Sequence, residues 1–464
     1  MRNIATVAVL ATMLLTSPGL ASNSYVLLNH ENEDSYIMPS IAYDAGTDRY
    51  NVTFIRANNY HDFDIFGWTG DLYAGTMVEQ SPGNFSLSID QCTQLNGMPV
   101  MIGTDYGDNP EHNWLHPWQR MLSYSKPSRQ GNMIVWSEMI DPWQNLIFYH
   151  DFNTGGGMLP PVDPTYGSWG RQINPRVSGD TVSSWGFFRD PNTGAGGWGM
   201  RIYGTTADRS IVIDDFRPED PYWNYYSHMA RSGGVYAETA IAGRAIFTMS
   251  EGSVDDPMAP LAVYWSRYDL DSQTNTTPEM IAPGLSPEVR INNILANDKY
   301  VIWHESHSSY LVPPPGAPQE EWEMYYNSVE PGGELAAAKW NGSTYEYIGY
   351  FWAASPSSQE AALFGDFLVY TDEDSSRILM INLEDLEMDW PEGPPVTVLA
   401  EASAGGTVEW PAVWVDENTG QYVVLYQSSD SPADLMVATN IPEPATLSLL
   451  ALGSLALVRR KRRA

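Results

Sequence analysis

The sequence predicts an all-β protein with the architecture of a β-propeller, and three observations support this prediction. A short phrase recurs seven times: a proline or small residue, a turn, and an alternating apolar run that ends on an aromatic side chain. A second strand-like run follows most copies across Asp, Asn, Gly, Ser or Pro, as hairpins require. The 38 glycines, 33 prolines and 12% aromatic residues suit many short strands and turns. Together these patterns favour seven blades, with six or eight as alternatives.

The seven copies recur along the whole central part of the chain. In chain order they are Pro39–Phe54, Pro127–Trp136, Pro175–Trp185, Ala240–Phe247, Pro287–Trp303, Ala361–Tyr370 and Pro411–Tyr426. The second strands are predicted at Leu146–Tyr149, Met200–Tyr203, Leu261–Trp265, Trp322–Tyr326, Arg377–Asn382 and Asp434–Ala438. Each terminal aromatic is expected to fill the wedge between neighbouring blades.

The spacing of the terminal aromatics is about 50 to 67 residues, except for one longer gap between Phe54 and Trp136. That gap contains either a degenerate blade around Met98–Gly103 or a large loop. Helical signals are scarce, and the best candidates, Pro331–Lys339 and Ser357–Ala362, are too short to determine the architecture.

Two stretches, Pro39–Phe54 and Pro127–Tyr149, carry a proline and small residue before a strand that ends on an aromatic. They resemble the repeats of bacterial extracytoplasmic propellers of the TolB-like kind. The resemblance implies a propeller fold over about half of the chain. It lacks the regular spacing of that family and carries over no functional residue.

The first 21 residues have the pattern of a secretory signal peptide. Met1-Arg2-Asn3 gives a positive start, residues 4–15 are nearly continuous apolar sequence, and small residues surround a cleavage site after Ala21. We therefore expect residues 1–21 to direct export and to be removed, leaving a propeller domain over residues 22–440.

Residues 441–464 combine a short polar motif, an apolar run and a basic end. The motif is Pro442, Glu443 and Pro444, the apolar run spans 445–458, and the basic residues are Arg459, Arg460, Lys461, Arg462 and Arg463. At about 1.5 Å per residue the run reaches about 21 Å, so it would cross a membrane only with thinning or arginine snorkelling. The basic end acts as a membrane stop on the cytoplasmic side.

This order of elements resembles the PEP-CTERM tail of Gram-negative bacteria. The resemblance implies that an exosortase recognises Pro442, Glu443 and Pro444, cleaves near them, and releases or attaches the protein outside the cell. The protein would then be held transiently in the inner membrane and later lie at the cell surface or outside the cell. An ordinary single-span anchor is the alternative for the tail.

The charge of the chain excludes some partners. It carries 24 basic and 57 acidic residues. Without residues 1–21 and 441–464 there remain 18 and 56, a net charge near −38. So acidic a domain is a poor partner for nucleic acid or an anionic membrane surface. Cys92 is the single cysteine, so stability must come from a core rather than from an internal disulfide.

Metal ligation is not predicted at any particular residue. His304 and His307 are three positions apart after a predicted strand, so they would point to opposite faces. His112 and His116 lie between prolines in a predicted loop. Calcium, which prefers carboxylate and carbonyl oxygens, remains open at several acidic pairs: Asp62 and Asp64, Asp214 and Asp215, Asp255 and Asp256, Asp269 and Asp271, and Asp372-Glu373-Asp374.

No catalytic residue is evident, because no nucleophile elbow, phosphate loop or paired carboxylate motif appears. Asp190–Gly194 and Asp416–Gly420 resemble sialidase-type turns only in opening on Asp and closing on Gly. Tryptophans in predicted loops could stack on sugar rings of an extracellular polysaccharide: Trp114, Trp118, Trp143, Trp169, Trp198 and Trp223. The sequence thus favours a non-enzymatic binding or structural component of the cell envelope or extracellular matrix. The alternative is a glycoside hydrolase or lyase on the same scaffold.

Overall fold

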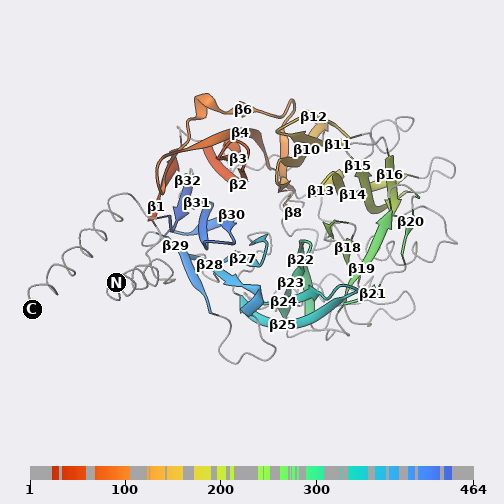
Figure 1. Cartoon of the computed structure of the whole chain (residues 1–464). Coiled ribbons are helices and arrows are strands. Elements are labelled where there is room, and N and C mark those ends of the chain that lie inside the picture. The colour runs from red at the N-terminus through yellow and green to blue at the C-terminus, as the bar shows by residue number, and fades with distance from the viewer. Residues whose placement is uncertain are drawn as a thin grey trace, which may run out of the picture.

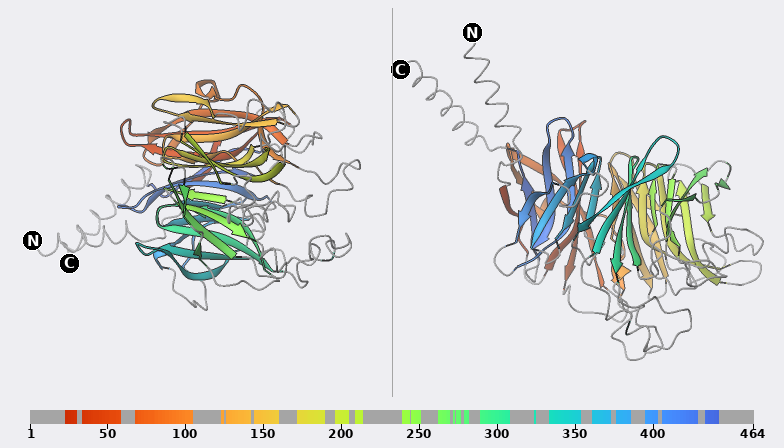
Figure 2. Two further views of the ribbon diagram at one scale, coloured as in Figure 1. Left: turned by 90° about the vertical axis from the view of Figure 1, so that its right-hand side faces the viewer. Right: turned by 90° about the horizontal axis from the view of Figure 1, so that it is seen from below.

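The strands of the computed structural model form a ring of sheets (Figure 1). The structure describes residues 23–30, 34–58, 68–104, 123–124, 126–141, 144–159, 172–189, 196–204, 209–213, 239–243, 245–250, 262–269, 272, 274–276, 279–281, 289–307, 324, 333–353, 361–372, 376–385, 395–402, 406–428 and 433–441. The turned views in Figure 2 show the strands of each sheet standing side by side around the ring. The prediction of an all-β propeller is therefore correct.

Four of the separate blades follow one another along the chain. The first contains β13 (Gln172–Ser178), β14 (Thr181–Arg189), β15 (Gly196–Gly204) and β16 (Arg209–Ile213). The second contains β17 (Thr239–Ala242), β18 (Ala245–Ser250), β19 (Ala262–Asp269), β20 (Thr274–Asn275) and β21 (Glu279–Met280). The third contains β22 (Val289–Ala296), β23 (Tyr300–His307), β24 (Gly333–Trp340) and β25 (Tyr345–Ala353). The fourth contains β26 (Ala361–Phe364), β27 (Phe367–Thr371), β28 (Arg377–Asn382) and β29 (Thr397–Glu401).

The fifth separate blade closes the ring with strands from both ends of the domain. β1 (Asn23–Leu28) pairs antiparallel with β32 (Leu435–Thr439), which is followed in the sheet by β31 (Gln421–Ser428) and β30 (Val408–Asp416). Asn23 lies opposite Thr439 in this ladder. Pairing β1 with β32 joins the two ends of the domain in one blade, because each hydrogen bond between these strands restrains both ends.

The remaining strands form one sheet of eleven rather than two separate blades. Its main path holds β2 (Asp34–Asp44), β3 (Arg49–Asn58), β4 (Trp68–Ser81), β7 (Val100–Thr104), β10 (Met133–Asp141), β11 (Gln144–Asp151) and β12 (Gly155–Met158). Beside it lie β5 (Asn84–Ser86), β6 (Thr93–Gln94), β8 (Ser123–Tyr124) and β9 (Ser128–Gln130).

The expectation of seven separate blades is therefore wrong. Within the described residues the structure has five separate blades and this one large sheet. The physical reason is β7, which pairs with both β4 and β10 and so joins the strands on either side of it. The segment Met98–Gly103, expected as a degenerate blade or a loop, supplies most of this bridging strand.

One segment considered as a helix in the sequence analysis forms a strand instead. Pro331–Lys339 overlaps β24, which pairs with β23 on one side and β25 on the other. Ala336, Ala337 and Ala338 are fully buried there. Small side chains let neighbouring sheets approach closely, so ladder pairing and burial outweigh the helical preference of alanine.

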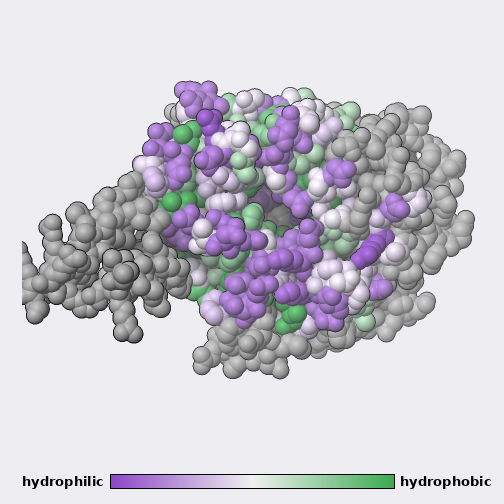
Figure 3. All heavy atoms as spheres, in the orientation of Figure 1, coloured by the Kyte–Doolittle hydropathy of each residue, from purple (hydrophilic) through white to green (hydrophobic). Residues whose placement is uncertain are grey.

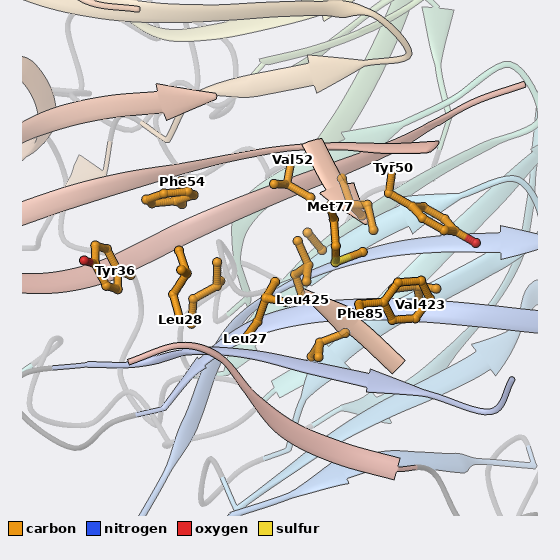
Figure 4. Packing of buried hydrophobic residues seen from close by; sticks show 14 residues of the cluster. Leu27, Leu28, Tyr36, Tyr50, Val52, Phe54, Met77, Phe85, Val423 and Leu425 are labelled. Atoms are coloured by element: carbon orange, nitrogen blue, oxygen red, sulfur yellow. The ribbon is translucent and has the colours of Figure 1, made fainter. Parts of the chain in front are cut away.

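The hydrophobic core is divided among the contacts between neighbouring sheets. One cluster joins Phe247 and Trp265 of one blade to Trp303 of the next. Another, drawn in Figure 4, joins Phe54 of β3 to Leu425 of the closing blade. The aromatics that end the repeats are buried wherever the structure describes them: Phe54, Trp136, Phe247, Trp303, Tyr370 and Tyr426. They fill the wedges between sheets, as predicted.

The turns at the ends of several hairpins are capped by acidic side chains. Asp44 accepts hydrogen bonds from the backbone N–H of Gly46 at 2.9 Å and the hydroxyl of Thr47 at 2.8 Å. Asp416 makes the same arrangement with Asn418 and Thr419. These are local side-chain caps of the turn, which explains why an acidic residue recurs before Gly and Thr. Some of the acidic residues of the chain therefore serve to cap hairpin turns.

Candidate functional site

The central hollow of the ring is the candidate functional site. Its cavity has a volume of about 530 Å³, and the first strand of seven successive hairpins lines it: β2, β9, β13, β17, β22, β26 and β30. Figure 3, which looks along the ring axis, shows a hollow at the centre bordered by hydrophilic residues. A cavity of this size could enclose a small molecule or the end of a chain.

Bulges at proline shape several lining strands. The ladder register shifts between Ile37 and Ser40 in β2, and between Glu409 and Ala412 in β30. Met38 and Trp410, which each precede a proline, have positive φ angles of 49° and 53°. Such a conformation costs energy in a non-glycine residue and needs support from its surroundings.

A buried polar link supports both bulges. The backbone N–H of Met38 donates to Oε1 of Gln427 at 3.3 Å, and Nε2 of Gln427 donates to Oε2 of Glu409 at 3.0 Å. Met38 and Trp410 also belong to one buried apolar cluster. The strained residues are thus fixed by hydrogen bonds and packing across the junction of β2 with the closing blade.

The described residues that line the cavity are mostly basic where charged, whereas the whole chain is strongly acidic. Among the described lining residues, four are basic (Lys126, Arg129, Arg176 and Lys299) and one is acidic (Asp298). Lys299 is already neutralised, because its Nζ lies 2.8 Å and 2.9 Å from the carboxylate oxygens of Asp366. The other three basic residues belong to two strands and their immediate flanks.

Those two strands, β9 and β13, lie next to each other on one wall of the cavity. The backbone N–H of Val177 donates to the Ser128 hydroxyl at 3.3 Å, and the N–H of Gly179 donates to the side-chain oxygen of Gln130. Lys126 and Arg129 come from the β9 segment and Arg176 from β13. We call these three residues the basic wall.

Arg129 of the basic wall is held by backbone carbonyls and an aromatic ring. Its Nε donates to the carbonyl of Gly131 and its Nη1 to the carbonyl of Asn51, both at 2.9 Å. Its guanidinium carbon lies 4.6 Å from the ring centroid of Phe152. Nη2 is shielded from solvent and has no hydrogen-bond partner. Burial lowers the pKa of Arg129, the direction expected for a cation withdrawn from water.

The other two members reach different surroundings. Lys126 places its Nζ 5.5 Å from the ring centroid of Trp410, beside the strained bulge of β30. Arg176 donates from Nη1 to the carbonyl of Pro175 at 3.3 Å. Neither residue was singled out by its sequence pattern. The signal that could have identified them is their position beside Pro127 and Pro175, the prolines that open two of the repeats.

The histidines and carboxylates considered as metal ligands are not gathered into one group within the described residues. His304 and His307, expected to follow a strand that ends at Trp303, lie within β23, which continues to His307. Asp269 lies in β19 and is exposed. Asp372 accepts hydrogen bonds from the backbone N–H of Arg377 at 2.8 Å and from its Nε at 2.6 Å, so its carboxylate caps the β27–β28 turn. No group of three or more potential ligands that could hold a metal occurs in the described part of the chain.

Several predicted residues lie outside the described residues. These are His112, His116, the remaining acidic pairs, the turn at Asp190–Gly194, and the loop tryptophans other than Trp198, which falls in β15. The turn at Asp416–Gly420 is described, and it is the capped hairpin turn between β30 and β31. It lies at the end of β30, and its carboxylate is engaged by Asn418 and Thr419 of the same turn.

The predicted targeting elements also lie outside the described residues. They are residues 1–21, Pro442, Glu443, Pro444, the apolar run and the basic end. Within the part of the chain that is described, no helix has the length and apolar character needed to cross a membrane. The signal peptide and the membrane helix therefore remain predictions.

Comparison with known proteins gives one match to a family model. Residues 440–463 match the PEP-CTERM protein-sorting motif. No curated protein resembles the chain in sequence.

Comparison with solved structures returns proteins of low sequence identity. The Pyrococcus horikoshii acylaminoacyl peptidase is 9% identical with a TM-score of 0.42, covering 87% of this chain and 51% of that one. The chain thus spans about half of that peptidase. The β-propeller domain of the Trilobed protease from Pyrococcus furiosus is 8% identical with a TM-score of 0.42, covering 87% and 98%. A mutant Trypanosoma rangeli sialidase is 11% identical with a TM-score of 0.37, covering 96% and 61%.

The match begins at Asn440, directly after β32 ends at Thr439. The chain is therefore a β-propeller that carries a PEP-CTERM protein-sorting motif at residues 440–463.

Proposed function

We propose that the protein is exported, held transiently in the inner membrane, processed by an exosortase-type enzyme, and then acts outside the cell as a binding component of the envelope or matrix. The sorting motif supports the first part of this proposal. The basic wall supports the second part, because it concentrates positive charge in a cavity of an otherwise acidic protein.

The ligand class follows from the chemistry of that wall. Three cationic side chains in a partly desolvated cavity attract an anion more strongly than exposed side chains would. Guanidinium groups bind carboxylates through directed hydrogen bonds. An acidic saccharide, such as the uronic acid residues of an extracellular polysaccharide, combines carboxylates with a size suited to about 530 Å³. The single observation that carries the proposal is the excess of basic residues, Lys126, Arg129 and Arg176 beside the paired Lys299, over the one acidic residue among the described residues that line the cavity.

The full-length protein in detergent is the material for the test, with calorimetry as the readout. A trimer of galacturonic acid should bind, and a neutral galactose trimer should bind more weakly by roughly tenfold or more, because it lacks charge-assisted contacts. Raising the salt concentration should weaken binding of the acidic trimer only. Inorganic phosphate serves as a third probe, since it separates general anion binding from saccharide binding.

Variants localise the binding. Lys126→Gln and Arg176→Gln should each weaken binding of the acidic trimer by about tenfold, the effect of one charge-assisted hydrogen bond. Lys339→Gln is the matched control, because Lys339 is a partly exposed residue of β24 that does not line the cavity, and its Nζ lies 3.6 Å from Glu384. Equal affinity for the acidic and neutral trimers, or unchanged affinity in both cavity variants, would contradict the proposal.

A further inference from the structure

The matched sorting region starts inside the folded domain rather than after a linker. β32 ends at Thr439, and the motif match covers residues 440–463. β32 lies within the closing blade, paired with β1 on one side and β31 on the other. The first residues of the sorting region are thus covalently next to a strand that holds the ring closed.

Asn440 is hydrogen-bonded to the end of the β30–β31 hairpin. Its Oδ1 accepts from the backbone N–H of Tyr422 at 2.8 Å, and its Nδ2 donates to the carbonyl of Gly420 at 3.0 Å. One side chain therefore satisfies a donor and an acceptor of the β31 strand start. The side-chain amide of asparagine carries both an acceptor and a donor, so it can serve both groups at once.

Whereas Asn440 contacts the β30–β31 hairpin, Ile441 lies against the β4–β5 turn. Its backbone N–H donates to the hydroxyl of Thr439 at 3.1 Å, and that hydroxyl donates to the carbonyl of Tyr422 at 2.7 Å. Its side chain, partly buried, packs against the cluster that includes Phe85. Asn440 and Ile441 therefore continue the ordered structure of the closing blade.

Gly83 shows how closely the turn approaches Ile441. A Cβ atom added at Gly83 would lie 2.3 Å from the carbonyl oxygen of Ile441, and Gly83 has a φ of 76°. Tyr25 of β1 holds this turn in place, because its hydroxyl donates to the carbonyl of Gly83 at 3.3 Å and accepts from the N–H of Phe85. The N-terminal strand, the β4–β5 turn and the start of the sorting region thus form one contact, which we call the latch.

We propose that the latch fixes the processing boundary, so that the enzyme cuts on the C-terminal side of Ile441 and the mature protein keeps Asn440 and Ile441 as part of its closing blade. This rests on the proposed processing at the motif. A protease must draw an extended, accessible segment into its active site, and residues that are hydrogen-bonded and packed enter only after local unfolding. A cut before Asn440 would also remove the side chain that satisfies Gly420 and Tyr422, and a cut before Ile441 would remove the residue that packs against the Phe85 cluster.

The processed protein from the native host provides the first test. Its intact mass should correspond to a C-terminus at Ile441 or later. A C-terminus at Asn440 or earlier would overturn the inference. The variant with Pro442, Glu443 and Pro444 all replaced by alanine separates the two proposals. If this variant is still processed, the proposed processing at the motif is refuted. If processing requires the motif but the product ends before Ile441, only the latch is refuted.

Limited proteolysis of the full-length protein gives a test that needs no exosortase. A broad-specificity protease should trim the wild-type protein no further than Ile441. Gly83→Ala should allow trimming into β32, with a rate about tenfold higher, because the added Cβ displaces Ile441.

Gly342→Ala is the matched control. Gly342 also has a positive φ, of 103°, but no atom lies within 4 Å of its added Cβ. It should be trimmed as the wild type is. Identical trimming of Gly83→Ala and Gly342→Ala would refute the latch even if both variants lose stability through backbone strain.

Discussion

Glu138 offers the sharpest test of how the large sheet is held together. The side chain is only 1% exposed, and its carboxylate accepts from Nε1 of Trp136 at 2.8 Å and from the N–H of Met98 at 3.0 Å. A third contact, from the N–H of Gly97, is long at 3.4 Å. The carboxylate thereby joins β10 to the segment that leads into β7, the strand that merges the two halves of the sheet.

Replacing Glu138 by alanine should destabilise the protein by about 3–5 kcal/mol. Two hydrogen bonds to a charged acceptor contribute about 1.5–3 kcal/mol each, and their loss leaves buried donors without partners. Part of this loss of stability is offset, because the variant no longer carries the desolvation cost of a buried carboxylate. The exposed Glu279 of β21 supplies the control, and Glu279→Ala should change stability by less than about 0.5 kcal/mol.

The measurement is urea denaturation of both variants, followed by tryptophan fluorescence and circular dichroism. A double-mutant cycle with Trp136→Phe isolates the hydrogen bond to Nε1, and it should give a coupling energy of about 1–2 kcal/mol. A loss below about 1 kcal/mol in Glu138→Ala would refute the argument, since it would mean that water or another group satisfies these donors.

Three further outcomes are expected. Burial raises the pKa of Cys92 to about 11, so at pH 8 only about one thiol in a thousand is ionised. Labelling of Cys92 with a disulfide reagent should therefore be far slower in the folded protein than in urea. Equal labelling rates would show that the thiol is accessible. The pKa of Asp416 is lowered mainly by the Thr419 hydroxyl and the N–H of Asn418, so its charged form stabilises the fold above about pH 4, and this contribution is lost as the pH falls through the folded-state pKa. Asp416→Ala should therefore lower the Tm at pH 7, and the gap to the wild type should narrow towards pH 2; a constant gap would exclude the titration as its cause. Trp303→Ala should lower the free energy of unfolding, measured by denaturant titration, by about 3–5 kcal/mol, because Trp303 is fully buried between two blades. A decrease no larger than that caused by Trp340→Ala, at a partly buried tryptophan, would contradict the role of Trp303 in filling the space between blades.

The hairpins could be predicted from the sequence because the signal for a strand is local. Alternating side chains and capped turns mark β2 with β3 and β30 with β31 within a few residues of the chain. The buried aromatics that end these repeats could be predicted for the same reason. The exception, Ala336–Ala338 in β24, is a segment whose local preference is helical and whose strand form depends on the two neighbouring strands.

The number of separate blades could not be predicted, because it depends on a pairing between distant segments. β7 is a short apolar run whose sequence does not reveal which strands it joins, and its contacts with β4 and β10 merge two hairpin sets. The basic wall was missed for a similar reason. Lys126, Arg129 and Arg176 are isolated basic residues in the sequence, and only the side-by-side placement of β9 and β13 brings them onto one wall of the cavity.

The sequence by itself determined the sorting motif at Pro442, Glu443 and Pro444, the repeated hairpins and the acidic character, since each is set by residue types at short spacing. The tertiary structure decided how the ring closes through β1 and β32, where the cavity concentrates cations, and how Asn440 and Ile441 are held. The physical reason is that ring closure, burial and charge compensation depend on contacts between residues that are far apart in the chain. Gly83, Tyr422 and Ile441 are brought together only by the folded ring.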